Sequence, residues 1–229
     1  MNQGLLLNRA PDDAPQAPAG PADRPLVLIV DDDAAVRTAI GELLFSVGID
    51  TEGFGSARAL LGAGLPDRPG CLVLDVRLPG SSGLDLQQHF AATANAKPIV
   101  FLTGHGDIPM TVQAMKAGAM DFLTKPVRDQ ALLDAVTAGI ERDKTLRAEA
   151  HSVGRQMDRY VTLTTREREI LRYVAQGRPT RQIACDLGIS EVTVKLHRGS
   201  VRRKMAVDTT GELIRAWNML PADLRDAGS

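Results

Sequence analysis

Short apolar runs alternate with segments of helical spacing over residues 25–140. Three of the runs, LVLIV at 26–30, CLVL at 71–74 and PIVFL at 98–102, are continuously apolar. Buried parallel strands have this pattern because helices cover both of their faces. Weaker strands are predicted at 50–54 and 120–123, and helices at 33–47, 56–63, 83–95, 107–117 and from 129 onward. The pattern therefore predicts an α/β domain, at 25–140, with a five-stranded, doubly wound parallel sheet.

The last helix of this series has no clear stop signal. Apolar residues keep a helical spacing from Leu132 to Leu146, while charged residues gather from Glu141 onward. We expect residues 141–160 to form a helical linker or a dimer-forming helix. Gly154 is its expected end, because glycine commonly terminates helices.

The rear of the chain, residues 161–229, has only helical patterns. Thr164 and Glu167 match a capping box, and Thr180 and Ser190 are expected to cap the next two helices. Helices are predicted at 165–176, 180–187, 190–205 and 210–219. A short helix followed by a glycine turn and a second helix is typical of a helix-turn-helix. We therefore expect a second, small all-α domain.

Composition indicates the cellular compartment and the character of the N-terminal residues. Residues 1–24 hold four prolines among Ala, Gly and Asp, which predicts a disordered tail. No apolar run reaches the roughly 20 residues that cross a bilayer, and the start does not resemble a secretion signal. Cys71 and Cys185 are far apart and are expected to be reduced core thiols. These features favour a soluble, cytoplasmic protein without membrane contact.

Charge is distributed unevenly although the net charge is only −1. Residues 1–140 carry 10 Lys and Arg against 16 Asp and Glu, whereas residues 159–229 carry 13 against 8. An acidic front half favours cation binding, and a basic rear half favours a polyanion such as nucleic acid.

Polar side chains follow four predicted strands at the point where each strand ends. They are Asp31, Asp32 and Asp33 after the first strand, Asp75 after the third, Thr103 after the fourth and Lys125 after the fifth. The carboxyl ends of parallel strands meet at one edge of a sheet, where ligands bind. Clustered carboxylates favour a hard cation such as Mg²⁺, which would allow one of them to act as a nucleophile toward phosphorus. Asp33 is expected to cap a helix instead.

Four stretches of this domain resemble receiver domains, specifically the FixJ branch of response regulators. They are VLIVDDD, CLVLDVRLPGSSGLDL, IVFLTGHGDIPM and AMKAGAMDFLTKP. The resemblance implies that Asp75 is phosphorylated by a sensor histidine kinase. It implies that Asp31, Asp32, Asp75 and the Arg77 carbonyl hold Mg²⁺, and that Thr103 and Lys125 contact the phosphoryl group. It also implies a cis Lys125-Pro126 bond and a switching role for Phe122, which could instead be an ordinary core aromatic.

The third helix of the rear domain is strongly basic. Its five cations are Lys195, Arg198, Arg202, Arg203 and Lys204, and no acidic residue lies between 192 and 207. Val192, Val194 and Val201 are expected to face the core. The exposed face would then contain Thr193, Lys195, Leu196 and Arg198 and could approach a DNA groove.

TTREREIL, ACDLGIS and EVTVKLHRGSVRRKM resemble the LuxR-type helix-turn-helix. The resemblance implies base contacts from Lys195 and Leu196, with His197 and Arg198 nearby. It also implies phosphate contacts from Thr180, Arg181, Arg202 and Lys204.

Together these features predict a transcription factor of two-component signalling and not an enzyme. The resemblance implies that phosphorylation drives homodimerisation through the face of helix four, strand five and helix five, with promoter DNA and RNA polymerase as partners. The face is predicted to include Met110, Val112, Ala114, Met115 and Lys116. Two alternatives remain: a phosphorylation-independent DNA-binding protein with the receiver as a dimerisation scaffold, and a metal-dependent aspartyl phosphohydrolase.

Overall fold

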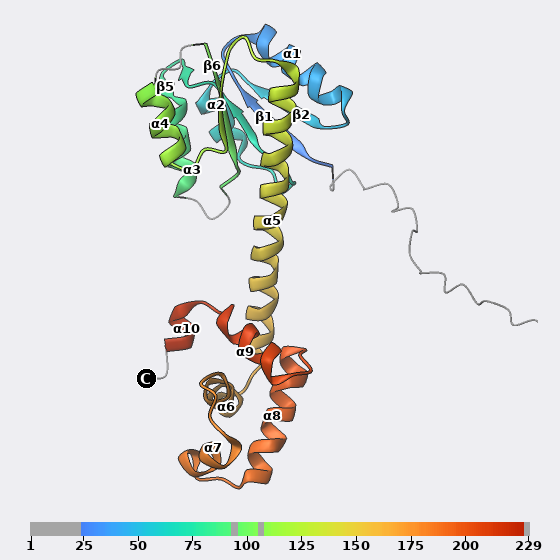
Figure 1. The fold of residues 1–229 in the computed structure, drawn as a ribbon, viewed down its shortest axis with the longest axis vertical. Coiled ribbons are helices and arrows are strands. Elements are labelled where there is room, and N and C mark those ends of the chain that lie inside the picture. The colour runs from blue at the N-terminus through green and yellow to red at the C-terminus, as the bar shows by residue number, and fades with distance from the viewer. Residues whose placement is uncertain (1–23, 93–95, 105–107, 227–229) are drawn as a thin grey trace, which may run out of the picture. The chain divides into compact units, whose positions relative to one another are not determined.

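The computed structural model describes residues 24–92, 96–104 and 108–226 (Figure 1). The chain divides into two compact units, one ending at Lys144 and the other beginning at Thr145, and each is described by itself. The predicted disordered tail lies, except for Arg24, outside the described residues.

Five parallel strands form the sheet of the first unit, in the order β2-β1-β3-β6-β7. They are β1 (Leu26–Val30), β2 (Asp50–Phe54), β3 (Leu72–Leu74), β6 (Ile99–Thr103) and β7 (Asp121–Thr124). Every residue of β1, β3 and β6 is buried, as their continuous apolar runs predict. The predicted five-stranded, doubly wound sheet is confirmed. Chain order reverses between β1 and β3, which opens a crevice at the carboxyl edge.

Helices cover both faces of this sheet (Figure 1). They are α1 (Ala34–Ser46) and the start of α5 (Asp129–Val161) on one face, and α2 (Ala57–Ala63), α3 (Gly83–Ala91) and α4 (Ile108–Lys116) on the other. Leu44 and Val136 are buried in the first core, and Leu60 and Phe90 are buried in the second. Each face therefore has its own apolar layer, which fixes the sheet between them.

A small hairpin, which the sequence did not predict, follows β3. β4 (Arg77–Leu78) pairs antiparallel with β5 (Ser81–Ser82), and Gly80 between them has φ +79°. Each strand has two residues, too few for an alternating pattern to show. Ser82 then caps α3, where Asp85 completes a capping box. The hairpin leads the chain from the carboxyl edge of the sheet directly into α3.

Helix α5 continues past Gly154 to Val161, so the predicted stop at this glycine is wrong. Glycine inside a helix costs only about 1 kcal/mol relative to alanine. Further along the helix, Met157 and Tyr160 pack against the core of the second unit. The burial of these two side chains outweighs the cost of the glycine.

A buried ion pair holds α5 against the first unit. Asp143, which lies within the predicted linker, is buried, and its Oδ2 is 3.2 Å from Nζ of Lys97. The same oxygen accepts a hydrogen bond from the Gly70 amide at 2.9 Å, and Lys97 also donates to the Arg68 carbonyl at 2.5 Å. These bonds compensate for burying both charges and join α5 to the loops that precede β3 and β6.

In the described residues of the second unit, helices joined by short loops are the only regular secondary structure. After the end of α5 come α6 (Thr165–Ala175), α7 (Thr180–Leu187), α8 (Glu191–Met205), α9 (Thr210–Asn218) and α10 (Ala222–Asp226). The capping box of Thr164 with Glu167 and the cap by Ser190 are confirmed. Pro179 occupies the cap position of α7, so the predicted cap by Thr180 is wrong; Thr180 is already helical. Helix α10, after Pro221, was not predicted.

The carboxylate of Glu167 connects α6 to α8 inside this unit. It accepts hydrogen bonds from Ser200 Oγ at 2.6 Å and Lys204 Nζ at 2.7 Å, as well as from Thr164. Burial acts to raise the pKa of Glu167, but the bonds from Lys204, Ser200 and Thr164 lower it to about 2. The charged form of this buried carboxylate is therefore the one that the fold stabilises.

The two cysteines occupy different environments. Cys71 is a buried free thiol, as predicted, but Cys185 is exposed on α7, so its prediction as a core residue is wrong. Among the described residues, no helix combines the length and the apolar character needed to span a bilayer.

We expect Glu167→Gln to destabilise the second unit by about 3 kcal/mol near pH 7, because the depressed pKa measures how strongly the fold favours the carboxylate. The folded pKa lies below the ordinary value of 4.5. The wild-type advantage is thus complete above pH 4.5 and is lost as the pH falls toward about 2. Denaturant unfolding followed by fluorescence of Trp217, the single tryptophan, measures it.

Glu169→Gln is the matched control. Glu169 forms a half-exposed ion pair with Arg166 on the same helix, so its loss should change stability by less than about 1 kcal/mol. Equal stability of wild type and Glu167→Gln at neutral pH would contradict the role given to Glu167.

Candidate functional site

Three carboxylates meet at the carboxyl edge of the sheet, as the strand ends predict. Asp31 and Asp32 follow β1, and Asp75 follows the neighbouring strand β3. One carboxylate oxygen from each lies within 4.8 Å of the others. Asp31 and Asp75 are buried and Asp32 is exposed, so the cluster opens to solvent on one side.

The ammonium of Lys125 bridges the two buried carboxylates. Its Nζ is 2.5 Å from Oδ2 of Asp31 and 2.7 Å from Oδ2 of Asp75. Partial burial acts to lower the pKa of Lys125, but the hydrogen bonds and charges of Asp31 and Asp75 raise it above its ordinary value. Lys125 is thus held in its charged form between them. The predicted cis Lys125-Pro126 bond is confirmed.

Backbone amides orient the other oxygens of the two buried carboxylates. Oδ1 of Asp31 accepts from the amide of Asp33, and Oδ1 of Asp75 accepts from the amide of Arg77, each at 3.0 Å. Three clustered carboxylates form the oxygen donor set that a small divalent cation prefers. The residues present therefore fit such an ion. Asp33 is turned away from it, because its carboxylate caps α1, as predicted.

Thr103 and Phe122 lie on the two strands beyond β3. Thr103 is buried at the end of β6, and its carbonyl accepts from the Lys125 amide at 2.8 Å. Phe122 of β7 is half-buried, and its ring centroid is 5.9 Å from that of Phe101, its register partner. Thr103 and Lys125 are thereby placed at the same sheet edge as Asp75. The functional roles predicted for Thr103, Lys125 and Phe122 remain predictions.

Gly83 supports this edge, and sequence reasoning missed it. A Cβ at this position would lie 2.4 Å from the carbonyl oxygen of Asp75 and 3.1 Å from Cα of Val76. The Gly83 amide donates to the Val76 carbonyl at 2.8 Å, which brings the two backbones together. The only sequence signal is a glycine directly after a helix cap, and such a glycine does not by itself indicate a close backbone contact. Asp75 is therefore positioned partly by a residue without a side chain.

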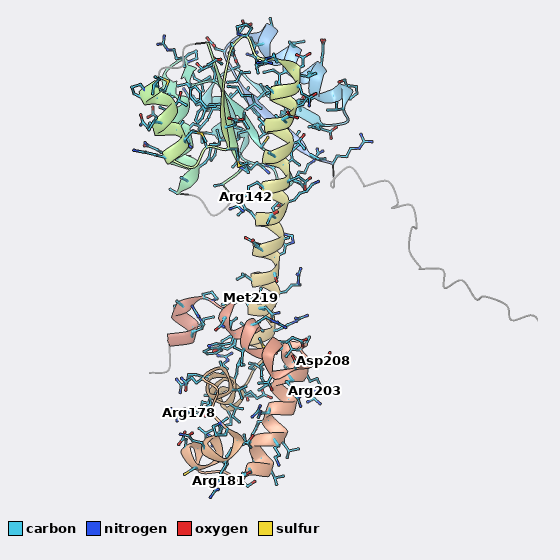
Figure 2. All side chains as sticks on the ribbon, in the orientation of Figure 1. Arg142, Arg178, Arg181, Arg203, Asp208 and Met219 are labelled. Carbon is cyan, nitrogen blue, oxygen red and sulfur yellow. The ribbon has the colours of Figure 1, made fainter. Side chains whose placement is uncertain are left out.

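Helix α8 carries most of the predicted DNA contacts. Lys195, Leu196 and Arg202 are exposed, and Thr193, His197 and Arg198 are half-buried. On α7, Arg181 is exposed and Thr180 is half-buried. Figure 2 shows the side chains of Arg181 and Arg203 extending away from their helices. The exposed cations can therefore approach a polyanion without unfolding any part of the unit.

Several of the predicted contact residues have partners inside the protein. Arg202 donates to the Asp208 carbonyl at 3.3 Å, and the hydroxyls of Thr193 and Ser190 are 2.8 Å apart. Lys204 pairs with Glu167 and donates to the Thr162 carbonyl at 3.2 Å. Arg198 donates to Thr180 Oγ1 at 3.1 Å, which orients it beside the start of α7. Lys204 consequently stabilises the fold, and its ammonium is already paired with a carboxylate.

Val192 is in a different place from the one predicted. It was expected in the core with Val194 and Val201, but the structure leaves it 66% exposed, while the other two are fully buried. Val194 lies in the same first turn and is buried. Val192 precedes it by two residues, about 200° around the helix, and therefore lies on the opposite face.

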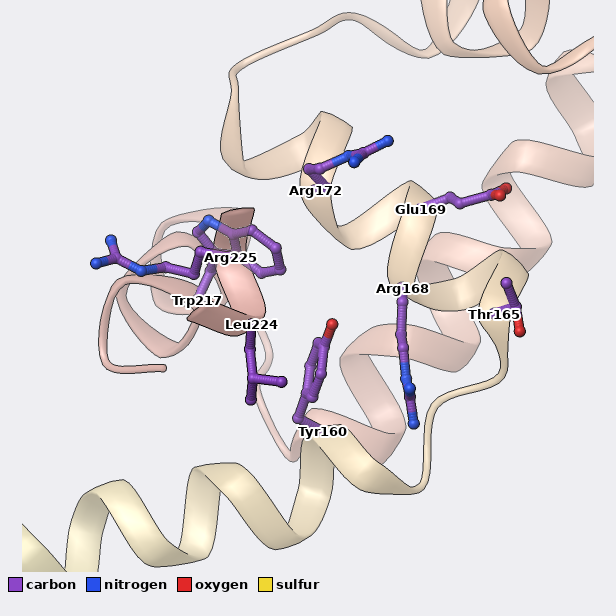
Figure 3. A pocket seen from close by; sticks show the side chains of 8 residues that line it. All are labelled: Tyr160, Thr165, Arg168, Glu169, Arg172, Trp217, Leu224 and Arg225. Atoms are coloured by element: carbon purple, nitrogen blue, oxygen red, sulfur yellow. The ribbon is translucent and has the colours of Figure 1, made fainter. Parts of the chain in front are cut away.

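A hollow of about 420 Å³ lies on another part of the second unit (Figure 3). Its lining includes Arg168, Arg172 and Arg225, together with Tyr160 and Trp217. Figure 3 shows Arg168 beside Tyr160, while Arg172 and Arg225 extend in other directions. The cations do not converge on one point, so we assign no ligand to it.

Two family models match the chain. Residues 27–137 match "Response regulator receiver domain", and residues 161–217 match "Bacterial regulatory proteins, luxR family". The chain is 49% identical to Nodulation protein W of Bradyrhizobium diazoefficiens, over 83% of this chain and 84% of that protein. It is 41% identical to Transcriptional regulatory protein FixJ of Azorhizobium caulinodans, over 82% and 90% respectively.

A solved structure is also similar over most of the chain. The low-resolution structure of Response Regulator StyR has a TM-score of 0.75 and 43% sequence identity, and the match covers 85% of this chain and 98% of that one. The similarity therefore spans both units rather than a single domain.

We expect Gly83→Ala to destabilise the first unit by about 2 kcal/mol, because the added Cβ would force the backbone of Asp75 to move. The same movement should weaken Mg²⁺ binding by the carboxylates. Thermal unfolding and calorimetric titration with Mg²⁺ measure the two effects. Gly62→Ala is the control: a Cβ added at this position in α2 would meet no atom within 4 Å, so Mg²⁺ affinity should be unchanged. Equal Mg²⁺ affinity in both variants would contradict the positioning role of Gly83.

Proposed function

Because the chain belongs to the two-component response regulators that join a receiver domain to a LuxR-type DNA-binding domain, we propose that phosphorylation of Asp75 controls its binding to promoter DNA. The observation that supports this most strongly is the carboxylate cluster with Lys125 bridging Asp31 and Asp75. It is the arrangement that phosphoryl transfer to a carboxylate needs.

In this proposal a carboxylate oxygen of Asp75 attacks phosphorus of a phosphohistidine on a sensor kinase. The P–N bond breaks, an acyl P–O bond forms, and the leaving imidazole nitrogen takes up a proton. Asp31, Asp32, Asp75 and the Arg77 carbonyl would hold Mg²⁺, which supplies charge neutralisation when bound. Lys125 exchanges its bond with the carboxylate for one with the phosphoryl group, and Thr103 donates its hydroxyl to another phosphoryl oxygen.

The response to phosphorylation is proposed to involve α4, β7 and Phe122. Ile108, Val112 and Met115 of α4 are exposed and follow one another at helical spacing. An exposed apolar row fits self-association of two receiver domains. The predicted face is corrected in one respect, because Ala114 is fully buried and Met110 packs against the core. Val112, Met115 and Lys116 remain exposed.

The DNA-binding part of the proposal rests on α7 and α8. Base contacts are assigned to Lys195 and Leu196, with Thr193, His197 and Arg198 nearby, and phosphate contacts to Thr180, Arg181 and Arg202. Lys204 is left out because Glu167 binds its ammonium. The dimer would act in the cytoplasm and recruit RNA polymerase at a promoter with two half-sites.

Asp75→Asn should abolish the gain in DNA affinity and in dimer fraction that beryllofluoride plus Mg²⁺ produces in the wild type, because the amide cannot form the acyl phosphate mimic. Gel shifts and analytical ultracentrifugation measure the two responses. Glu42→Gln, on an exposed turn of α1 outside the predicted dimerisation face, should respond as the wild type does.

The alternatives predict other results. An equal response of Asp75→Asn and wild type would favour the receiver as a phosphorylation-independent scaffold. Multiple turnovers of a small phosphate ester that depend on Asp75 would favour a phosphohydrolase.

Lys195→Ala should weaken binding to the preferred site by about tenfold and change the base preference, since Lys195 is assigned to base edges. Arg202→Ala should weaken binding to all sequences alike and reduce the salt dependence by about one unit of slope, since it is assigned to phosphate. Fluorescence anisotropy against specific and scrambled duplexes at several salt concentrations separates the two. Unchanged base preference in Lys195→Ala would show that the groove assignment is wrong.

A further inference from the structure

Two large apolar side chains on α8 are exposed to solvent. Val192 is 66% exposed and Leu196 is 71% exposed. Elsewhere in the described part of the second unit, the exposed large apolar side chains are Val161, at 62%, and Met219, at 37%. Half of the exposed large apolar side chains of this unit therefore lie on one turn of one helix.

Neither local structure nor core packing accounts for Val192. The core contacts of α8 come from Val194, Val201 and Met205, which are all fully buried. A β-branched residue at an exposed helical position is less favourable than Lys or Glu, because its side chain loses rotamer freedom. Val192 thus lowers helix propensity and exposes apolar area at a position where the fold gains nothing from it.

The two side chains form a single apolar strip. Residues four apart on a helix are neighbours, with Cβ atoms about 6 Å apart. The exposed ammonium of Lys195 adjoins the strip, and the exposed cations Arg202 and Arg203 follow on the same helix. The strip is therefore apolar in itself but lies in a strongly basic surrounding.

Charge selects the occupant of this strip. A protein partner that covered it would also have to desolvate Lys195, whereas DNA pairs the surrounding cations with phosphates. In the major groove, the apolar group at the base edges is the C5-methyl group of thymine. Successive base pairs are about 3.4 Å apart along the axis, so two side chains about 6 Å apart can reach methyl groups one or two steps apart.

Building on the proposed DNA binding, we infer that Val192 acts with Leu196 as a specificity-determining pair that reads two thymine methyl groups in each half-site. Lys195 supplies the hydrogen bonds and the pair supplies the apolar contacts. Val192 is then a specificity residue rather than the core residue that was expected.

The test removes single methyl groups from the DNA. The full chain, activated with beryllofluoride and Mg²⁺, first selects its site from a random duplex library. Each thymine of that site is then replaced in turn by deoxyuridine, which lacks only the C5-methyl group, and the Kd is measured by fluorescence anisotropy. We expect two replacements per half-site to weaken binding of the wild type by about fourfold each, the value of one buried methylene-sized group.

Two variants assign the methyl groups to side chains. Val192→Ser should bind the thymine and deoxyuridine versions of one position equally, and Leu196→Ser should do so at the other. Val161→Ser is the matched control, because Val161 is 62% exposed at the end of α5, where the chain contacts α8 at Lys204 and Met205, the end of α8 opposite to Val192. It should retain both fourfold penalties.

The possible failures are distinguishable. Specific binding that is indifferent to every deoxyuridine replacement overturns the inference and leaves the proposed function intact. A Val192→Ser variant that keeps all wild-type penalties, or that changes self-association rather than base preference, also overturns it. Absence of binding to any duplex overturns the proposed function and this inference together.

Discussion

Electrostatic repulsion among three carboxylates at one edge of the sheet is the constraint on which the first unit depends. Oxygens of Asp31, Asp32 and Asp75 lie within 4.8 Å of one another, and two of these groups are buried. Lys125 offsets the repulsion by binding both buried carboxylates, and it can do so because its amide is hydrogen-bonded to the end of β6. The pairing of β6 with β7, far from Asp31 in the sequence, thus positions the ammonium of Lys125, which offsets the repulsion among the carboxylates.

Much of this arrangement could be predicted because it follows from chain-wide regularities. Continuous apolar runs located β1, β3 and β6, and the polar residues just after them had to meet at one edge. Gly83 could not be predicted, because its importance comes from a close approach to Asp75 that only the folded backbone creates. Gly154 was predicted to end the helix and does not, because packing further along α5 decides where that helix ends.

Charge counted along α8 overstates the number of cations available for DNA. Lys204 is bound to Glu167, and that pair joins α8 to α6 and so fixes the helix that presents the remaining cations. Val192 was also expected in the core, although it lies about 200° around the helix from the buried Val194 and therefore on the opposite face. In both cases the residue type was identified correctly but the direction of its side chain was not: Lys204 turns toward Glu167, and Val192 lies on the face opposite the core.

Because one cysteine thiol is buried and the other is exposed, a thiol-reactive label can be attached at a single position of the chain. Burial is the main cause that raises the pKa of Cys71 to about 12, so near neutral pH it is an enclosed thiol with almost no thiolate. Cys185 is exposed on α7, the helix that precedes α8. A thiol-reactive fluorophore should therefore label Cys185 alone, giving a reporter beside the basic helix in a protein with no engineered residue.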